Sequence, residues 1–157
     1  MKLKRKIIVI YFLSIFTFTN FYCQKKEQIN KDELSKHRQL FWDSLPKSSN
    51  FVNDYENLFT DVEDKELNLI IGQFNIKTKI EIAIVTLDTI VVSKEKFDDL
   101  TLHIAKTWGI GKKELDNGIL IGISKGYKKI RIQNGNGIEL ILSNEETKEI
   151  LDFTSVH

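Results

Sequence analysis

Apolar and polar positions along the chain follow helical spacing in three stretches. Thr60-Asp61-Val62-Glu63 is a capping-box pattern, in which a hydroxyl and a Glu three residues later satisfy free N–H groups at a helix start. Apolar residues at helical spacing follow it and predict a helix over about 61–75. The same spacing predicts a helix over about 95–107, and a second capping box, Ser143 to Glu146, predicts a last helix over about 144–153.

Three other stretches have the patterns of β-strands. Residues 79–87 begin with alternation and become a β-branched run. Residues 118–124 are continuously apolar, which is typical of a strand buried on both faces. Residues 127–134 alternate strictly after a short turn at Lys125-Gly126, so a strand with one wet face is expected to pair with its predecessor as a hairpin.

The order helix, strand, helix, strand, strand, helix predicts the fold class. A strand–helix–strand unit makes a crossover with two parallel strands, and the hairpin adds an antiparallel one. We therefore expect a small layered α/β domain with a mixed sheet and helices on both faces.

The first 23 residues have a different pattern from the rest. Residues 1–6 hold four basic side chains, residues 7–23 carry no charge, and a polar stretch begins at Gln24. This order is the signature of a secretory signal peptide, so we expect export to the periplasm or cell envelope. The alternative is a retained membrane anchor over residues 7–23, which is shorter than the roughly 20 apolar residues of a membrane span. Lipidation of Cys23 is disfavoured because bulky residues precede it, and the pattern leaves the cleavage position open.

Residues 24–50 are polar and contain the only proline, Pro46. They predict a linker with a short helix around 31–42, followed by one domain over 51–157.

Charge and cysteine content exclude several classes of protein. The whole chain has 23 basic and 22 acidic residues, a net charge of +1. Without residues 1–23 it keeps 19 basic and 22 acidic residues, a net charge of −3, which argues against nucleic acid as a partner. A single cysteine excludes an intramolecular disulfide or a cysteine-cluster metal site.

Polar clusters at the ends of the predicted elements are the candidates for chemistry. Asp54 could hold a cation, although a turn or capping role is the more ordinary interpretation. In the loop 108–118, Asp116 and Glu114 offer oxygen ligands suited to Ca²⁺ or Mg²⁺, and Lys112 or Lys113 could hold an anion. The cluster 135–139 has turn chemistry, and the chain contains no nucleotide-binding fingerprint, serine-nucleophile elbow or histidine pair with metal-ligand spacing.

Four motifs in order resemble the TPM domain: V-N-D-Y (52–55), A-x-x-W-G-I-G (105–111), D-N-G-I-L-I (116–121) and I-R-I…G-N-G-I-E…L-S (130–143). That family includes plant thylakoid lumen acid phosphatases, photosystem repair factors, acetylcholine-receptor accessory proteins and many exported bacterial proteins. The resemblance implies an α/β/α sandwich outside the cytoplasm and a divalent-cation site, with calcium or magnesium, near the D-N-G loop. It also implies phosphatase activity in some members.

Carried over by motif, Asp54, Asp116 and Asn117 match the expected metal-binding positions. The sequence departs from the family pattern where Asn136 replaces an aromatic residue and Asn144 replaces an acid. Relatives also continue beyond the position of His157, so a closing helix is expected to be missing here.

Two functions follow. In the first, the chain is a non-catalytic partner-binding or maintenance module with a divalent-cation site, and its partner is an envelope or membrane protein. In the alternative, a metal-assisted phosphatase uses Asp54 and Asp116 to hold the cation and Lys112 to steady the phosphate. The missing acid at Asn144 and the absence of a His or Cys nucleophile favour the first.

Overall fold

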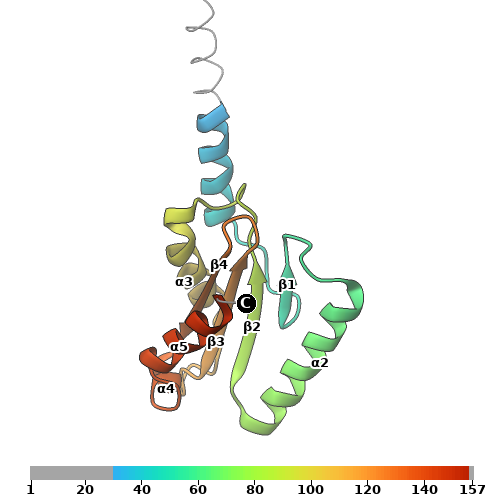
Figure 1. Ribbon diagram of the computed structural model, residues 1–157, viewed down its shortest axis with the longest axis vertical. Helices are drawn as coiled ribbons and strands as arrows, with labels where there is room; N and C mark the ends of the chain where they lie inside the picture. The colour runs from blue at the N-terminus through green and yellow to red at the C-terminus, as the bar shows by residue number, and fades with distance from the viewer. Residues whose placement is uncertain (1–29, 156–157) are drawn as a thin grey trace, which may run out of the picture. The chain divides into compact units, whose positions relative to one another are not determined.

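The computed structural model describes residues 30–155 (Figure 1). Residues 30–43 are helical. After them the order is β1 (Val52–Asp54), α2 (Asp61–Thr78), β2 (Glu81–Thr86), a 3₁₀ turn η1 (Lys94–Lys96), α3 (Phe97–Trp108), β3 (Gly118–Ser124), β4 (Lys129–Asn134), α4 (Asn136–Glu139) and α5 (Asn144–Ser155). The predicted signal peptide and anchor over residues 1–23 lie outside the described residues.

The chain divides into two compact units, one up to Leu40 and one from Phe41 onward. The described part of the first unit, residues 30–40, is helical. The second unit contains every strand of the described part of the chain. It includes residues of the predicted linker that pack against its core: Phe41, Trp42 and Leu45. Trp42 stacks on the His103 ring with 4.5 Å between centroids, and Trp108 Nε1 donates to Pro46 O at 2.9 Å.

The sheet confirms the predicted strand pairing. Its order is β1-β2-β3-β4, with β1, β2 and β3 parallel and β4 antiparallel to β3. The crossover from β2 through α3 therefore returns to a parallel neighbour, and the β3–β4 connection is the expected hairpin. The mixed α/β fold class predicted from the sequence is confirmed.

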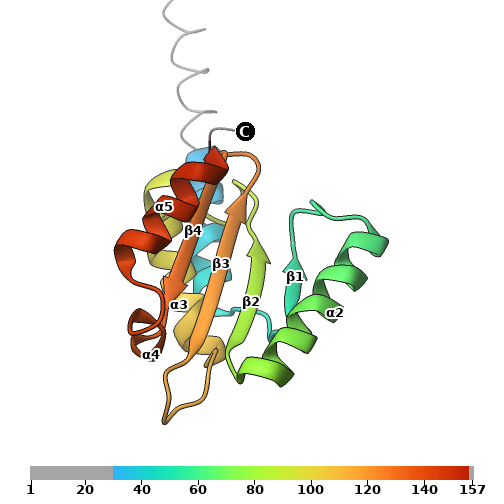
Figure 2. The ribbon, with the colours of Figure 1, turned by 60° about the horizontal axis from the view of Figure 1, so that its bottom comes forward.

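Helices cover both faces of the sheet. α3 packs on the face that carries Leu120, where the larger core cluster is centred on Phe97, Leu100 and Ile104. α2 covers β1 and β2 on the other face through Ile71, which packs with Val52 and Ile84. α5 lies on β4, so helices lie on both faces and the α/β/α sandwich is formed (Figure 2).

Both predicted capping boxes are present. Thr60 Oγ1 accepts from Glu63 N at 3.3 Å, and Glu63 Oε2 accepts from Thr60 N at 2.8 Å. Ser143 Oγ accepts from Glu146 N at 3.2 Å, and Glu146 Oε2 accepts from Ser143 N at 2.8 Å. These reciprocal bonds fix where α2 and α5 begin because they satisfy N–H groups that have no partner inside the helix.

The structure adds one strand to the sequence predictions and corrects two of them. Val52–Asp54 is a strand that periodicity could not show, because three residues are too few for an alternation. Residues 136–139, expected as a turn, form the single helical turn α4. β3 was expected to be buried on both faces, but Ile119, Ile121 and Ile123 are only half-buried while the side chains between them are buried.

Among residues 30–155, no helix has the length and apolar character needed to cross a bilayer.

Candidate functional site

Asp54 closes the loop that follows β1. Its Oδ1 accepts from Leu58 N at 3.0 Å and from the Thr86 hydroxyl, and its Oδ2 accepts from Phe59 N at 2.8 Å. Burial by itself would raise the pKa of Asp54, but these hydrogen bonds outweigh burial and hold the pKa below its ordinary value. Both carboxylate oxygens are thus used to order the chain from Asp54 to the start of α2, as in the turn-forming interpretation of the sequence.

Asn117 is buried and its amide joins two segments. Its Nδ2 donates to Lys79 O at 2.6 Å, and its Oδ1 accepts from Lys112 N at 2.9 Å. Its backbone oxygen accepts from Glu81 N at 3.1 Å. Asn117 therefore ties the loop before β3 to the start of β2.

Asp116 joins the D-N-G loop to the G-N-G loop that follows β4. Its Oδ2 accepts from Asn136 N at 2.9 Å, and its backbone oxygen accepts from Gly137 N at 3.0 Å. A Cβ at Gly135 or Gly137 would collide with the backbone oxygens of Asp116 or Leu115. The glycines of the third polar cluster are needed because the two loops touch backbone to backbone.

Lys112 and Asp116 line one open cleft of about 790 Å³. The cleft lies between the end of α3, the loop 109–118 and the end of β4. Its basic residues are Lys106, Lys112 and Lys113, and Asp116 is its one carboxylate. Within the described part of the chain these lysines form no ion pair, so their charges are available to an anion.

The structure does not bring Asp54 and Asp116 together. Asp54 pairs with Thr86 at the carboxyl end of β2, while Asn117, next to Asp116, bonds to Glu81 at the amino end of that strand. Five residue steps of a strand separate the two ends, a distance of roughly 16 Å. Because Ca²⁺–oxygen distances are about 2.3–2.6 Å, one cation cannot bind both carboxylates.

The three predicted ligands therefore do not fit one preformed cation site. The Asn117 amide is already hydrogen-bonded at both atoms, and Asp54 lies at the far end of the sheet. In residues 30–155 no group of three or more His, Cys, Asp or Glu side chains could hold a metal ion. Of the predicted ligands, Asp116 alone has a carboxylate in the cleft.

Comparison with known proteins agrees with the architecture. The sequence model of the TPM domain matches residues 52–156, about two thirds of the chain. The chain belongs to the TPM domain family. A search of curated proteins finds no match. Among solved structures, the chain is similar to the solution NMR structure of the N-terminal domain of a protein from P. gingivalis. The two are 25% identical over 69% of this chain and 68% of that chain, with a TM-score of 0.61.

Sequence reasoning missed three residues around the cleft of this TPM domain. Lys106 and Gln133 line it, and Glu81 Oε2 accepts from Gly111 N at 3.1 Å on the loop that forms one wall. Lys106 could have been found because it lies one turn before Gly109, at a helix end beside the loop. Glu81 and Gln133 are strand residues, and only the register of the sheet shows that they meet the loops.

Proposed function

We propose that this TPM domain is an exported cell-envelope module that binds a protein partner and does not hydrolyse a phosphoester. The separation of Asp54 from Asp116 carries the proposal, because the two carboxylates of the catalytic hypothesis are at opposite ends of the sheet. The side chains of Asp54 and Asn117 order loops. Support for export comes from the basic and apolar order of residues 1–23.

Exposed apolar side chains support binding to a partner. Large exposed apolar side chains of the second unit lie together on one flank of α2 and on the segment from α4 to α5: Ile70, Phe74, Leu140, Ile141 and Ile150. Single exposed apolar residues are ordinary, but clusters of them mark interaction surfaces.

The lysine-lined cleft supports a second candidate function, phosphomonoester hydrolysis. Lys106, Lys112 and Lys113 could hold a phosphate group beside the Asp116 carboxylate. A metal-assisted mechanism would need a Ca²⁺ or Mg²⁺ ion at Asp116 without Asp54 or the Asn117 amide as ligands. Cation binding at Asp116, without Asp54 or Asn117 as further ligands, stays a prediction.

Hydrolysis of a generic aryl phosphate by the purified full chain separates the two candidates. The variants are Asp116→Asn and Lys112→Gln in the cleft, with Lys65→Gln on α2 as the matched control. We expect no hydrolysis above the level of Asp116→Asn, together with an envelope protein that co-purifies reproducibly with the chain. Turnover that both cleft variants abolish and the control keeps would replace the first function by the second.

Thermal unfolding with added Ca²⁺ or Mg²⁺ tests the cation separately. An ion at 100 times its Kd that binds only the folded chain adds about 2.7 kcal/mol to the free energy of unfolding. If Asp116 holds the ion, Tm rises in the wild-type chain and not in Asp116→Asn. An unchanged Tm in both removes the cation and the metal-assisted alternative with it.

A further inference from the structure

The second face of β3 is an apolar surface that no helix of residues 30–155 fully covers. Ile119, Ile121 and Ile123 point to this face, and the register pairs Ile121 with Ile132 and Ile123 with Ile130 on β4. We call these five side chains the isoleucine face. All are partly or well exposed, whereas Leu120, Gly122 and Ser124 on the opposite face of β3 are buried. In Figures 1 and 2, β3 runs between α2 and α5, which flank it.

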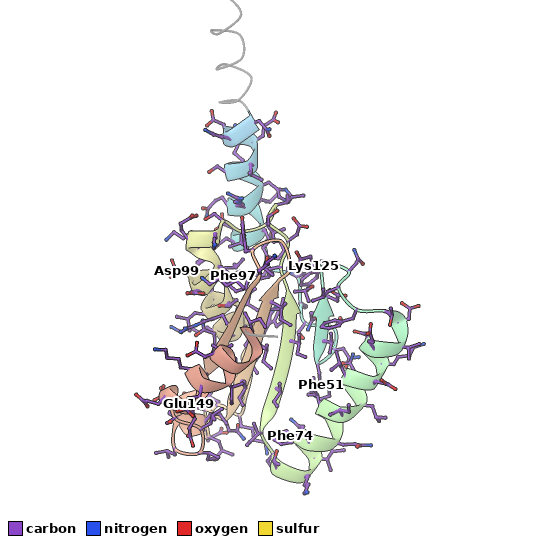
Figure 3. The ribbon with its side chains drawn as sticks, viewed as in Figure 1. Phe51, Phe74, Phe97, Asp99, Lys125 and Glu149 are labelled. Atoms are coloured by element: carbon purple, nitrogen blue, oxygen red, sulfur yellow. The ribbon has the colours of Figure 1, made fainter. Side chains whose placement is uncertain are left out.

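α2 adds apolar residues to one border of this face. Asn68 accepts from Val52 N at 3.1 Å and Gly72 lies against Phe51, so this flank of α2 is turned toward β1, as Phe51 shows in Figure 3. A helix turns about 100° per residue, which places Ile70 and Phe74 on the other flank, toward the centre of the sheet. Both side chains are exposed there.

α5 forms the other border, where the surface is hollowed. An open pocket of about 500 Å³ lies between the β3–β4 hairpin and α5. Ile123 and Ile130 of the isoleucine face line it together with Leu151 of α5. Lys128, Lys129 and Asp152 also line it, and Lys129 Nζ forms an ion pair with Asp98 Oδ1 at 2.9 Å.

The charge of both borders selects the chemistry of the occupant. α2 contains four acidic and two basic residues, and α5 contains four acidic and one basic residue. Glu66 precedes Ile70 by one helical turn on the same flank of α2. A second copy of this chain would bring acidic helices against acidic helices, so self-association through this face is disfavoured.

We propose that the isoleucine face, with Ile70 and Phe74, binds an amphipathic helix of a partner protein that carries lysine or arginine beside its apolar stripe. The inference rests on the proposed partner-binding function and specifies its surface. An apolar stripe would cover the isoleucines, and basic side chains on its flanks would meet the acidic residues of α2 and α5. The association rate should fall with added salt because both borders are exposed.

Two adjacent residues of α2 provide a matched pair of variants. Leu69 and Ile70 are each 61% exposed. The turn of about 100° per residue places Leu69 on the outer surface of α2 and Ile70 on the flank toward the centre of the sheet. The probe is a synthetic amphipathic helix with a leucine stripe flanked by lysines, and its counterpart has glutamates in place of the lysines. We expect Ile70→Gln to weaken binding of the lysine peptide to the full chain about tenfold, a change of about 1.4 kcal/mol, and Leu69→Gln to leave it unchanged. Unfolding curves of both variants establish that each is folded.

Three binding results would overturn the proposal. Equal affinity for the lysine and glutamate peptides would remove the charge argument. A larger loss for Leu69→Gln than for Ile70→Gln would move the site to the outer surface of α2. Self-association of the chain that Ile70→Gln abolishes would make a second copy the occupant.

Photo-crosslinking in the exporting cell separates this proposal from the general partner-binding function. A photoreactive residue at position 70 is expected to crosslink to a basic amphipathic segment of another protein, and one at position 69 is not. Crosslinks from position 69 alone would overturn the assigned surface and leave partner binding in place. The absence of protein crosslinks from both positions, with no co-purifying protein, would contradict both proposals.

Discussion

At the scale of single residues, the motif side chains of this TPM domain hold backbone in place. Asp54 receives N–H groups from the loop after β1, and Asn117 connects Lys79 to Lys112 through its buried amide. A buried amide that loses these partners costs about 1–3 kcal/mol for each group left without a hydrogen bond. These positions can therefore be required for folding whether or not a ligand binds beside them.

Asp54→Asn should make stability less dependent on acidic pH. The pKa of Asp54 is lowered in the folded chain. The pKa of an Asp side chain in an unfolded chain is about 3.9. The ionised group therefore stabilises the fold above that value, and the contribution is lost as the pH falls through the folded pKa. We expect the wild-type free energy of unfolding to drop toward that of Asp54→Asn below about pH 5, as measured by urea unfolding across pH.

The exposed acid Glu66, changed to Gln, is the control for this measurement. The capping acids Glu63 and Glu146 also have a lowered pKa because of their backbone hydrogen bonds. Their contributions cancel in the difference between the wild type and Asp54→Asn. A difference that stays constant from neutral to acidic pH would show that Asp54 does not act through its charge.

At the scale of elements, the contact of α3 with the sheet requires a glycine in β3. A Cβ at Gly122 would collide with Thr101 Cγ2. The Thr101 hydroxyl also donates to Asp98 O at 2.9 Å and accepts from Gln133 Nε2 at 2.9 Å. The close approach of α3 to β3 therefore depends on the absence of a side chain at Gly122 and on the hydrogen bonds of the Thr101 hydroxyl.

Gly122→Ala should lower the free energy of unfolding by about 1–3 kcal/mol because it overpacks this contact. Thr101→Ser removes the colliding methyl group and keeps the hydroxyl, so the double variant should recover part of the loss in denaturant unfolding. Gly72→Ala on α2 is the control, because its Cβ would lie at an ordinary 3.4 Å from Phe51. Gly72→Ala should leave the free energy of unfolding unchanged or raise it by up to about 1 kcal/mol. Equal losses for Gly122→Ala and the double variant would exclude the Thr101 methyl as the cause.

At the scale of the whole molecule, the charge of the chain depends on its first 23 residues. These residues contribute four positive charges and no negative ones to the net charge of +1. The rest of the chain has a net charge of −3, and four acidic residues on each of α2 and α5 contribute to it. Export with cleavage would therefore convert a weakly basic chain into an acidic one.

The exported protein should bind an anion exchanger at neutral pH and have an intact mass that lacks the first residues. Replacing the basic residues at positions 2, 4, 5 and 6 with glutamine should reduce the exported fraction, because a signal peptide needs a positively charged N-terminal region. The same number of Lys→Gln changes at exposed lysines of residues 94–148 is the control. A full-length mass in the membrane fraction would favour the retained anchor instead.

The sequence by itself determined six of the elements, their order and the pairing of β2, β3 and β4. Hydrophobic period, capping boxes and glycine turns are local properties, so residues a few positions apart were enough to predict α2, β2, α3, β3, β4 and α5. The same local patterns could not show β1, which has three residues, or α4, which has four.

Only the tertiary structure decided which residues share a site. The motifs placed Asp54, Asp116 and Asn117 in one group, but parallel pairing through β2 puts Asp54 and Asp116 at opposite ends of the sheet. Burial of β3 was decided in the same way: its sequence is apolar on both sides, yet the positions of α2 and α5 leave one side half-covered. Which carboxylates meet and which apolar face stays open are properties of register and packing between distant segments, and no local pattern contains them.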